Sequence, residues 1–377
     1  MAAIGYRNGY GDNGVIDGKG YQNNHDSDEK LDADAEKGAL KSTNKTSKDD
    51  PFGDESKSEV KYRTMAWWQA GMLMIAETIS IGILSLPSTL AAVGIVPGVI
   101  LIAGLGILAT YTAFVIGQFK LAYPHVHSMA DAGEVMLGHI GREVFGAAQI
   151  LFLVFAMASH ILAFSIMLNT VTSHGTCTIV FGVVGLLVCL VFTLPRTLER
   201  VSHMAIVSFV SIVAACLITI IGVGVEKPGD QKVLPTVKSD LAKAFGAVTN
   251  IVFAYAGNVA FFSFMSELRT PESYPKALFL LQGVDISMYL IVAIVIYRYT
   301  GTDVKSPALS SASPLLQKIA YGVAIPTIVI AGAINGHVAA KYIYMGLGLY
   351  ASGTAISSDA KSSNGSFSCA DNSKPSS

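Results

Sequence analysis

Residues 72–87 read Met-Leu-Met-Ile-Ala-Glu-Thr-Ile-Ser-Ile-Gly-Ile-Leu-Ser-Leu-Pro. This apolar stretch contains one carboxyl group, three hydroxyl groups and two residues that weaken an α-helix: Glu77, Thr78, Ser80, Ser85, Gly82 and Pro87. A helix that is interrupted in the middle of a membrane leaves backbone N–H and C=O groups free to bind charged groups of a ligand. The stretch therefore predicts a membrane-spanning helix with a broken, polar centre.

The composition of the whole chain favours a membrane protein. Of its 377 residues, 51% are hydrophobic and 14% are charged, whereas soluble domains have roughly 25% charged residues. Apolar blocks of close to ~20 residues, the length that crosses the hydrocarbon core, occupy 67–92, 95–121, 144–170, 176–194, 203–225, 244–265, 277–299 and 319–344. The sequence therefore predicts an all-α polytopic membrane helical bundle with about eight spans.

Polar residues are concentrated at the two ends of the chain. Residues 1–64 and 345–377 have too little apolar surface to offset the entropy of ordering them. We expect two disordered tails around a membrane domain at 65–344. The short connections at 196–200 and 269–276 are basic, and those at 93–94 and 171–175 contain no Lys or Arg. This asymmetry predicts a cytoplasmic N-terminus.

The polar groups of the quoted stretch have two interpretations. A charge within hydrocarbon costs ~2.5–3.5 kcal/mol on insertion scales, so Glu77 is either a carboxyl group linked to protons or ligand, or an acid near the interface. The interfacial reading rests on its distance of ~15 Å from Trp67 along the helix. The hydroxyls of Thr78 and Ser85 either bind substrate or bond back to their own turn of a kinked helix.

The sixth expected span, 244–265, has a similar interruption. Tyr255, Gly257 and Asn258 place a hydroxyl group, a flexible backbone position and an amide near its middle. Two broken helices at corresponding positions are typical of transporters built from two inverted repeats. The alternative is close helix packing through small residues, among them Ala254 and Ala260.

No motif of an enzyme or a cofactor site is present in the sequence. It contains no Gly-rich phosphate loop after a strand, no nucleophile elbow, no HExxH motif and no CxxC pair. His125, His127 and His139 have poor spacing for a metal site, and we expect solvated loop histidines on a short amphipathic helix at 122–143. His160 stands alone in the third span and is interpreted as a packing residue. We expect no enzyme activity, no cofactor, no metal and no nucleic acid partner.

Several stretches, taken together, resemble the amino acid/auxin permease family of transmembrane amino acid transporters, especially its fungal neutral amino acid permeases. The matching stretches are 75–87, 244–255, 261–267 with Pro271, 276–278 and 332–344. The resemblance implies the five-plus-five inverted-repeat fold, neutral amino acids and protons as transported partners, and substrate binding at the two interrupted spans. The candidate substrate-binding residues there are Thr78, Ser80, Gly82, Ser85, Tyr255, Gly257 and Asn258, with Glu77 as the candidate proton-coupling residue.

One feature departs from the family pattern. Its members have about eleven spans, five in each repeat, whereas the apolar blocks here stop after the eighth. We therefore expect an incomplete second repeat and a C-terminally truncated permease. The expected function is secondary active transport of neutral amino acids by proton symport, at the plasma membrane rather than the vacuolar membrane. The alternative is a non-transporting membrane protein, either a nutrient sensor or an inactive truncated permease.

Overall fold

The computed structural model describes residues 63–80, 82–194, 198–229 and 232–358, with the backbone alone at residue 200 and residues 345–358. Nearly all of the described residues are helical, and among them the only β pairing is an isolated bridge between Met65 and Leu268. The predicted all-α architecture is confirmed.

Five helices within the described ranges are long and apolar enough to cross a membrane unaided. They are α4 (Ile95–Ala122), α5 (Met129–Thr172), α7 (Leu198–Glu226), α10 (Tyr274–Thr300) and α11 (Pro314–Ser358). Large apolar side chains are exposed on such helices, for example Ile107, which is 67% exposed on α4. Water opposes such exposure and lipid accepts it, so the chain is an integral, multi-pass membrane protein.

Two more apolar segments are helix pairs that bend at a break. The first pair is α2 (Trp67–Thr78) and α3 (Gly82–Val93), which bend by 50°. The second pair bends by 41° and joins α8 (Leu241–Ala254) to the segment that contains η2 (Ala256–Ala260) and α9 (Phe261–Ser266). Counting each pair as one span gives up to seven spans among the described residues. Both helix interruptions expected from the sequence are therefore present.

The expected fourth span is the short helix α6 (Thr178–Thr193). Its 16 residues reach ~24 Å at 1.5 Å per residue, less than the ~30 Å of the hydrocarbon core. All eight apolar blocks are thus helical, but the count of eight membrane crossings stays a prediction. The remaining short elements are η3 (Pro271–Ser273), η4 (Gly301–Asp303) and η5 (Ala308–Ser311).

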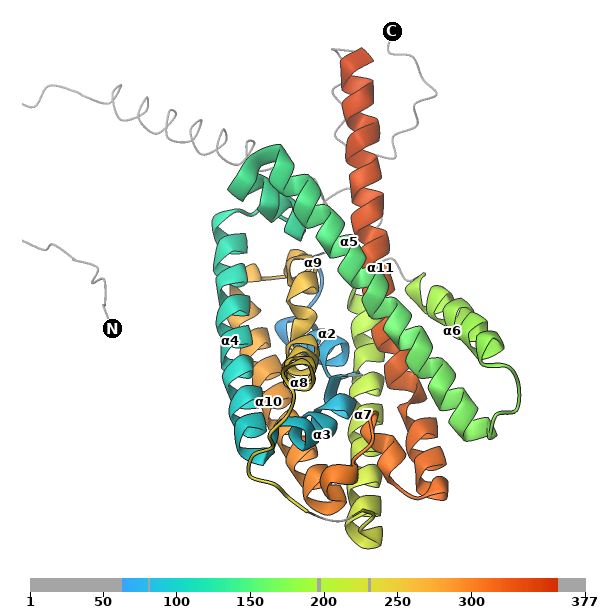
Figure 1. Cartoon of the computed structure of the whole chain (residues 1–377). Coiled ribbons are helices and arrows are strands. Elements are labelled where there is room, and N and C mark those ends of the chain that lie inside the picture. The colour runs from blue at the N-terminus through green and yellow to red at the C-terminus, as the bar shows by residue number, and fades with distance from the viewer. Residues whose placement is uncertain (1–62, 81, 195–197, 230–231, 359–377) are drawn as a thin grey trace, which may run out of the picture. The chain divides into compact units, whose positions relative to one another are not determined.

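The helix contacts show how the two bent pairs are arranged (Figure 1). Helix α3, the second half of the first pair, packs against α8, the first half of the second pair, and α2 contacts α9. The two pairs therefore run antiparallel. Helix α10 packs against both α2 and α3, α7 packs against α2, and α11 packs against α5 and α7. An antiparallel pairing of two broken helices is the relation that inverted repeats produce.

One end of the bundle is joined by a set of bonds that we call the Glu267 network. Glu267, directly after α9, is fully buried, and its Oε1 lies 2.5 Å from Lys341 Nζ on α11. Its Oε2 accepts the N–H of Leu198, the first residue of α7, at 2.8 Å, and its backbone oxygen accepts the N–H of Met65 at 3.1 Å. The network therefore ties the start of the first broken span to α7, α9 and α11.

The region before the third span has a helix break and a buried histidine. Gly138 within α5 has φ 66° and ψ −154°, so the helix is interrupted there, close to the end of the expected amphipathic helix. His127 is buried, and its Nδ1 lies 2.8 Å from Ser266 Oγ. The expectation of a solvated His127 is wrong, because α9 covers it. Burial, followed by the charge of Lys120, lowers the pKa of His127.

The last described helix passes the boundary expected at residue 344. Helix α11 continues to Ser358, so residues 345–358 differ from the disordered tail that their composition indicated. Helix α11 is the long C-terminal helix in Figure 1. The expected N-terminal tail up to residue 62, and residues 359–377, lie outside the described residues.

Candidate functional site

The two breaks contact each other through glycines. A side chain at Gly82 would place its Cβ 2.7 Å from Ala254 Cα, and one at Gly257 would overlap Glu77 Oε2 and lie 2.5 Å from Thr78 Cγ2. Ordinary van der Waals contact begins at 3.4 Å. Glycine at position 82 thus lets the backbones of the two breaks approach closely, and glycine at position 257 leaves room for the side chains of Glu77 and Thr78.

The ends of the broken helices share one hydrogen-bond donor. Helix α2 ends at Thr78 and α8 ends at Ala254, and carbonyl groups at a helix C-terminus have no partner within the helix. The hydroxyl of Tyr289 on α10 lies 3.0 Å from the Thr78 oxygen and 2.8 Å from the Ala254 oxygen. Tyr289 thus holds both breaks against α10. Nothing in the sequence distinguishes this tyrosine from the others in its span.

A small cavity lies where the two breaks meet α5 and α11. Its free volume is about 30 Å³. The residues that line it are Glu77, Thr78, Ser80, Gly82, Phe152, Ala156, His160, Phe253, Ala254, Ala256, Gly257 and Asn335. Five of the eight residues selected from the sequence are in this set. This volume is smaller than an amino acid.

The hydroxyls of Thr78 and Ser85 bond to their own helices. Thr78 Oγ1 donates to the Met74 oxygen at 3.0 Å, and Ser85 Oγ donates to the Gly82 oxygen at 2.8 Å. For Ser85 the structure shows the bond back to its own turn, and the residue does not line the cavity. Thr78 lines the cavity, although its hydroxyl also bonds back to its own helix, and a role in substrate binding stays a prediction.

Tyr255 and Asn258 also lie outside the lining set. The Tyr255 hydroxyl donates to the Ile102 oxygen on α4 at 3.1 Å, and its ring centroid is 5.0 Å from that of Tyr289. The Asn258 amide donates to Thr112 Oγ1, also on α4, at 3.1 Å. These two residues attach the second break to α4.

His160 has a second neighbour that the sequence did not reveal. Its Nδ1 lies 2.7 Å from the Ala156 oxygen, and its Nε2 lies 3.0 Å from Ser80 Oγ. Because a carbonyl only accepts, Nδ1 carries the proton, and in the neutral ring Nε2 accepts from Ser80. His160 therefore contacts the first break as well as packing within the bundle. A histidine in an apolar span was visible in the sequence, but not the direction in which it points.

Two acceptor atoms at the cavity have no hydrogen-bond partner among the described residues. They are Glu77 Oε2 and Asn335 Oδ1, while the Asn335 amide nitrogen donates to the Ala331 oxygen at 3.0 Å. Buried acceptors without donors are costly, so these atoms favour a ligand with N–H groups. The N-terminus of α3 at Gly82 carries the opposite polarity and favours an anion. The cavity thus combines groups of both kinds.

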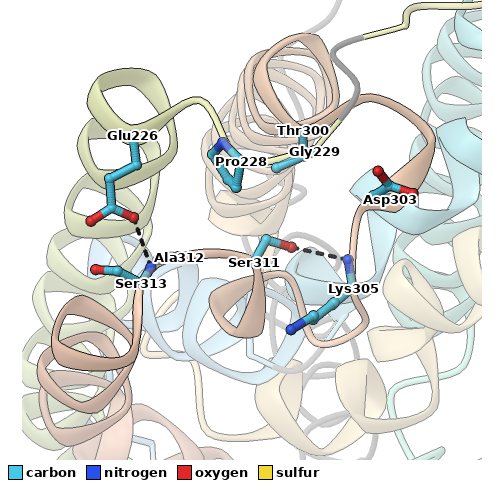
Figure 2. Close-up of a pocket in the computed structure, with 9 residues that line it drawn as sticks. All are labelled: Glu226, Pro228, Gly229, Thr300, Asp303, Lys305, Ser311, Ala312 and Ser313. Carbon is cyan, nitrogen blue, oxygen red and sulfur yellow. Dashed lines mark hydrogen bonds between the residues drawn. The ribbon is translucent and has the colours of Figure 1, made fainter.

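A larger hollow lies at the C-terminal end of α7, beside Glu226 (Figure 2). Its free volume is about 370 Å³. Glu226 there accepts the N–H of Ser313 at 2.8 Å, and the N–H of Lys305 donates to Ser311 Oγ at 3.0 Å. These bonds shape the connection between α10 and α11. Neither helix break lines this hollow, so size alone does not identify the functional site.

In the part of the chain that the structure describes, no three His, Cys, Asp or Glu side chains lie close enough together to hold a metal ion.

A model of the transmembrane amino acid transporter protein family matches residues 63–364. The chain belongs to this family. The match includes both helix breaks and every residue of the cavity, and it confirms the resemblance identified from the sequence.

Three fungal relatives in this family match over 300 residues, 77% of this chain. The N amino acid transport system protein of Neurospora crassa is 40% identical, and the chain covers 64% of its length. Proteins described as transmembrane transporters from Gibberella moniliformis and Fusarium pseudograminearum are 32% and 30% identical, each covered over 63% of its length. The chain therefore spans less than two thirds of the length of these relatives.

Proposed function

We propose that this protein is a secondary active transporter that carries neutral amino acids across a membrane together with protons. The observation that carries the proposal is the meeting of two broken helices, at Gly82 and Gly257, around a polar cavity inside a membrane bundle. Family membership, and a relative named for amino acid transport, support the substrate class.

An α-amino acid has one cationic and one anionic group, and the cavity offers a counterpart for each. The ammonium group is bound by the free acceptors Glu77 Oε2 and Asn335 Oδ1 and by the C-terminal end of α2. The carboxylate is bound at the N-terminus of α3, beside Ser80 and Gly82. Phe152 adds an apolar wall, which favours a neutral side chain because an unpaired second charge would be costly there.

The three selected residues outside the cavity have a supporting role in this proposal. Ser85 stabilises the first turn of α3, whereas Tyr255 and Asn258 hold the second break against α4. Thr78 acts through its backbone and its position at the cavity. The substrate is thus bound chiefly by backbone groups of the breaks, for which Gly82 and Gly257 provide access.

Glu77 is the proposed proton-coupling residue of the cavity. It is 8% exposed, and its Oε2 has no hydrogen-bond partner among the described residues. An ionised carboxyl group in this setting is costly, so proton binding and ammonium binding are the two ways of neutralising it. Substrate and proton then act on the same group, which provides the link that symport requires.

The Glu267 network supports a cytoplasmic N-terminus. It brings Met65, Glu267 and Lys341 together at one end of the bundle. The basic connection that contains Arg269 and Lys276 starts at this end, since it follows α9 directly. Positive charge in short connections favours the cytoplasmic side. We propose the plasma membrane as the location.

Uptake by cells that lack their own amino acid permeases tests the proposed function. The full chain is expressed, and uptake of labelled alanine and phenylalanine is measured in acidic and neutral medium. We expect accumulation that is faster in acidic medium and collapses with a protonophore, with labelled lysine and glutamate excluded. Binding without accumulation would instead support a nutrient sensor. Accumulation that is unchanged by the protonophore would refute proton symport.

A further inference from the structure

Asp285 lies on α10 behind the two breaks, outside the cavity lining. Its side chain is 0% exposed, and neither carboxyl oxygen has a hydrogen-bond partner among the residues that the structure describes. An ionised carboxyl group without donors is strongly unfavourable at low dielectric constant, and such groups are neutralised by a proton instead. Buried ionisable groups within a membrane mark functional pathways more often than structural ones.

The hydroxyl groups around Asp285 donate their hydrogen bonds to backbone carbonyl oxygens. The Thr78 hydroxyl faces Asp285 but donates to the Met74 oxygen at 3.0 Å. The Tyr289 hydroxyl is bonded to the carbonyl oxygens of Thr78 and Ala254. Each of these protons holds a backbone carbonyl in place. An ionised Asp285 would attract these hydroxyl protons away from the carbonyl oxygens.

Among the residues that the structure describes, no cation acts on Asp285. Glu77 on α2 acts on it electrostatically, and Asp285 in turn acts on Tyr255, which follows α8, and on Tyr289 of α10. Helix α3 contains no Asp, Glu, His, Lys or Arg. Helices α4 and α7 also pack against α10, and their charged and histidine residues lie near the helix ends. Because Glu77 and Asp285 are both acids, ionisation of one opposes ionisation of the other.

We infer that Asp285 is a second proton-binding group of the transport cycle, and that Thr78 and Tyr289 link it to both helix breaks. This inference rests on the proposed transport function. Proton release breaks the carboxyl O–H bond and transfers the proton to water that enters as α10 separates from the breaks. The resulting carboxylate accepts hydrogen bonds from the Thr78 and Tyr289 hydroxyls. The Thr78 and Ala254 carbonyl groups then lose the bond to Tyr289, which links proton release to a rearrangement of both breaks. Exchange of substrate uses the protonated form and does not need this step.

The test uses the full chain in liposomes with the membrane potential held at zero. Two properties are measured for wild type, for Asp285→Asn and for the control Ser287→Ala, whose hydroxyl bonds within α10 at Gly283. The first property is exchange of labelled alanine without a pH gradient. The second is the steady accumulation ratio of alanine at a gradient of one pH unit. Each coupled proton contributes about tenfold to that ratio.

We expect Asp285→Asn to retain exchange of alanine but to accumulate about tenfold less, and Ser287→Ala to match wild type in both properties. An unchanged accumulation ratio in Asp285→Asn would overturn the inference. Loss of exchange together with accumulation would overturn it too, because Asp285 would then be needed for substrate movement itself. A wild type that exchanges alanine without responding to the pH gradient would instead reject the proposed symport.

A measurement on the unmodified chain covers the case in which Asp285→Asn does not fold. Infrared spectra of protein with carbon-13 labelled aspartate report protonated carboxyl groups directly. We expect a labelled carboxylic acid band at neutral pH, where exposed aspartates are ionised. Absence of that band would overturn the inference whether or not the protein transports amino acids.

Discussion

Replacing Gly257 by alanine adds one methyl group at the point where the two breaks meet. Its Cβ would overlap Glu77 Oε2 and lie 2.5 Å from Thr78 Cγ2, far inside the 3.4 Å at which ordinary contact begins. Overpacking of this kind costs ~1–3 kcal/mol. Both neighbours line the cavity, so the strain falls on the proposed substrate site. If the cost falls on the substrate-bound state, transport declines by about 5- to 150-fold.

Gly246→Ala is the matched control for this prediction. Gly246 belongs to α8, the first half of the same bent pair, and a Cβ there would meet nothing within 4 Å. Alanine is favoured over glycine in a helix by up to ~1 kcal/mol, so the control is expected to be neutral or slightly more stable. The assay compares surface expression, thermal stability in detergent and initial rates of labelled alanine uptake. Wild-type uptake by Gly257→Ala would refute the close contact of the breaks as a functional requirement.

Three further changes have expected outcomes. Tyr289→Phe removes the hydroxyl shared by the two helix ends and leaves buried carbonyls unpaired, at ~1–3 kcal/mol; the thermal unfolding temperature should fall, and an unchanged value would contradict the assigned bonds. Glu267→Gln is expected to cost ~3–5 kcal/mol by removing the buried carboxylate that pairs with Lys341, whereas exchanging the two residues should restore part of the stability in the thermal unfolding assay. Ser80→Ala should reduce alanine uptake more than Ser85→Ala, because Ser80 lines the cavity and bonds beyond its own turn; equal effects on uptake would contradict this distinction.

Much of the fold was predictable because membrane insertion imposes simple rules. Backbone groups must be paired within helices in hydrocarbon, so apolar blocks of sufficient length predicted the helices. The breaks were predictable for a related reason, since Gly82 and Gly257 stand beside polar groups in otherwise apolar spans. Helix α6 shows the limit of this reasoning. Its composition is apolar, but its length is short, so composition and geometry lead to different span counts.

The direction of each side chain was not predictable from one sequence. Ser85 and Asn258 satisfy the same polar pattern as Ser80, but they bond to α3 and to α4 instead of facing the cavity. Conversely, His160 was interpreted as a packing residue and lines the cavity. Which face a polar residue presents depends on contacts between helices that are distant in the sequence. Those contacts are set by the fold as a whole and leave no local signal.

Protection of a cysteine in the cavity by substrate tests the location of the substrate site most directly. The native cysteines are replaced, and Ala256→Cys or Ser313→Cys is introduced into separate full-length proteins, the first in the cavity and the second in the larger hollow. Rates of labelling by a small thiol reagent are compared with and without saturating alanine in protein that still transports it. We predict slower labelling at position 256 and no change at position 313. Protection at 313 without protection at 256 would contradict a substrate site at the two breaks.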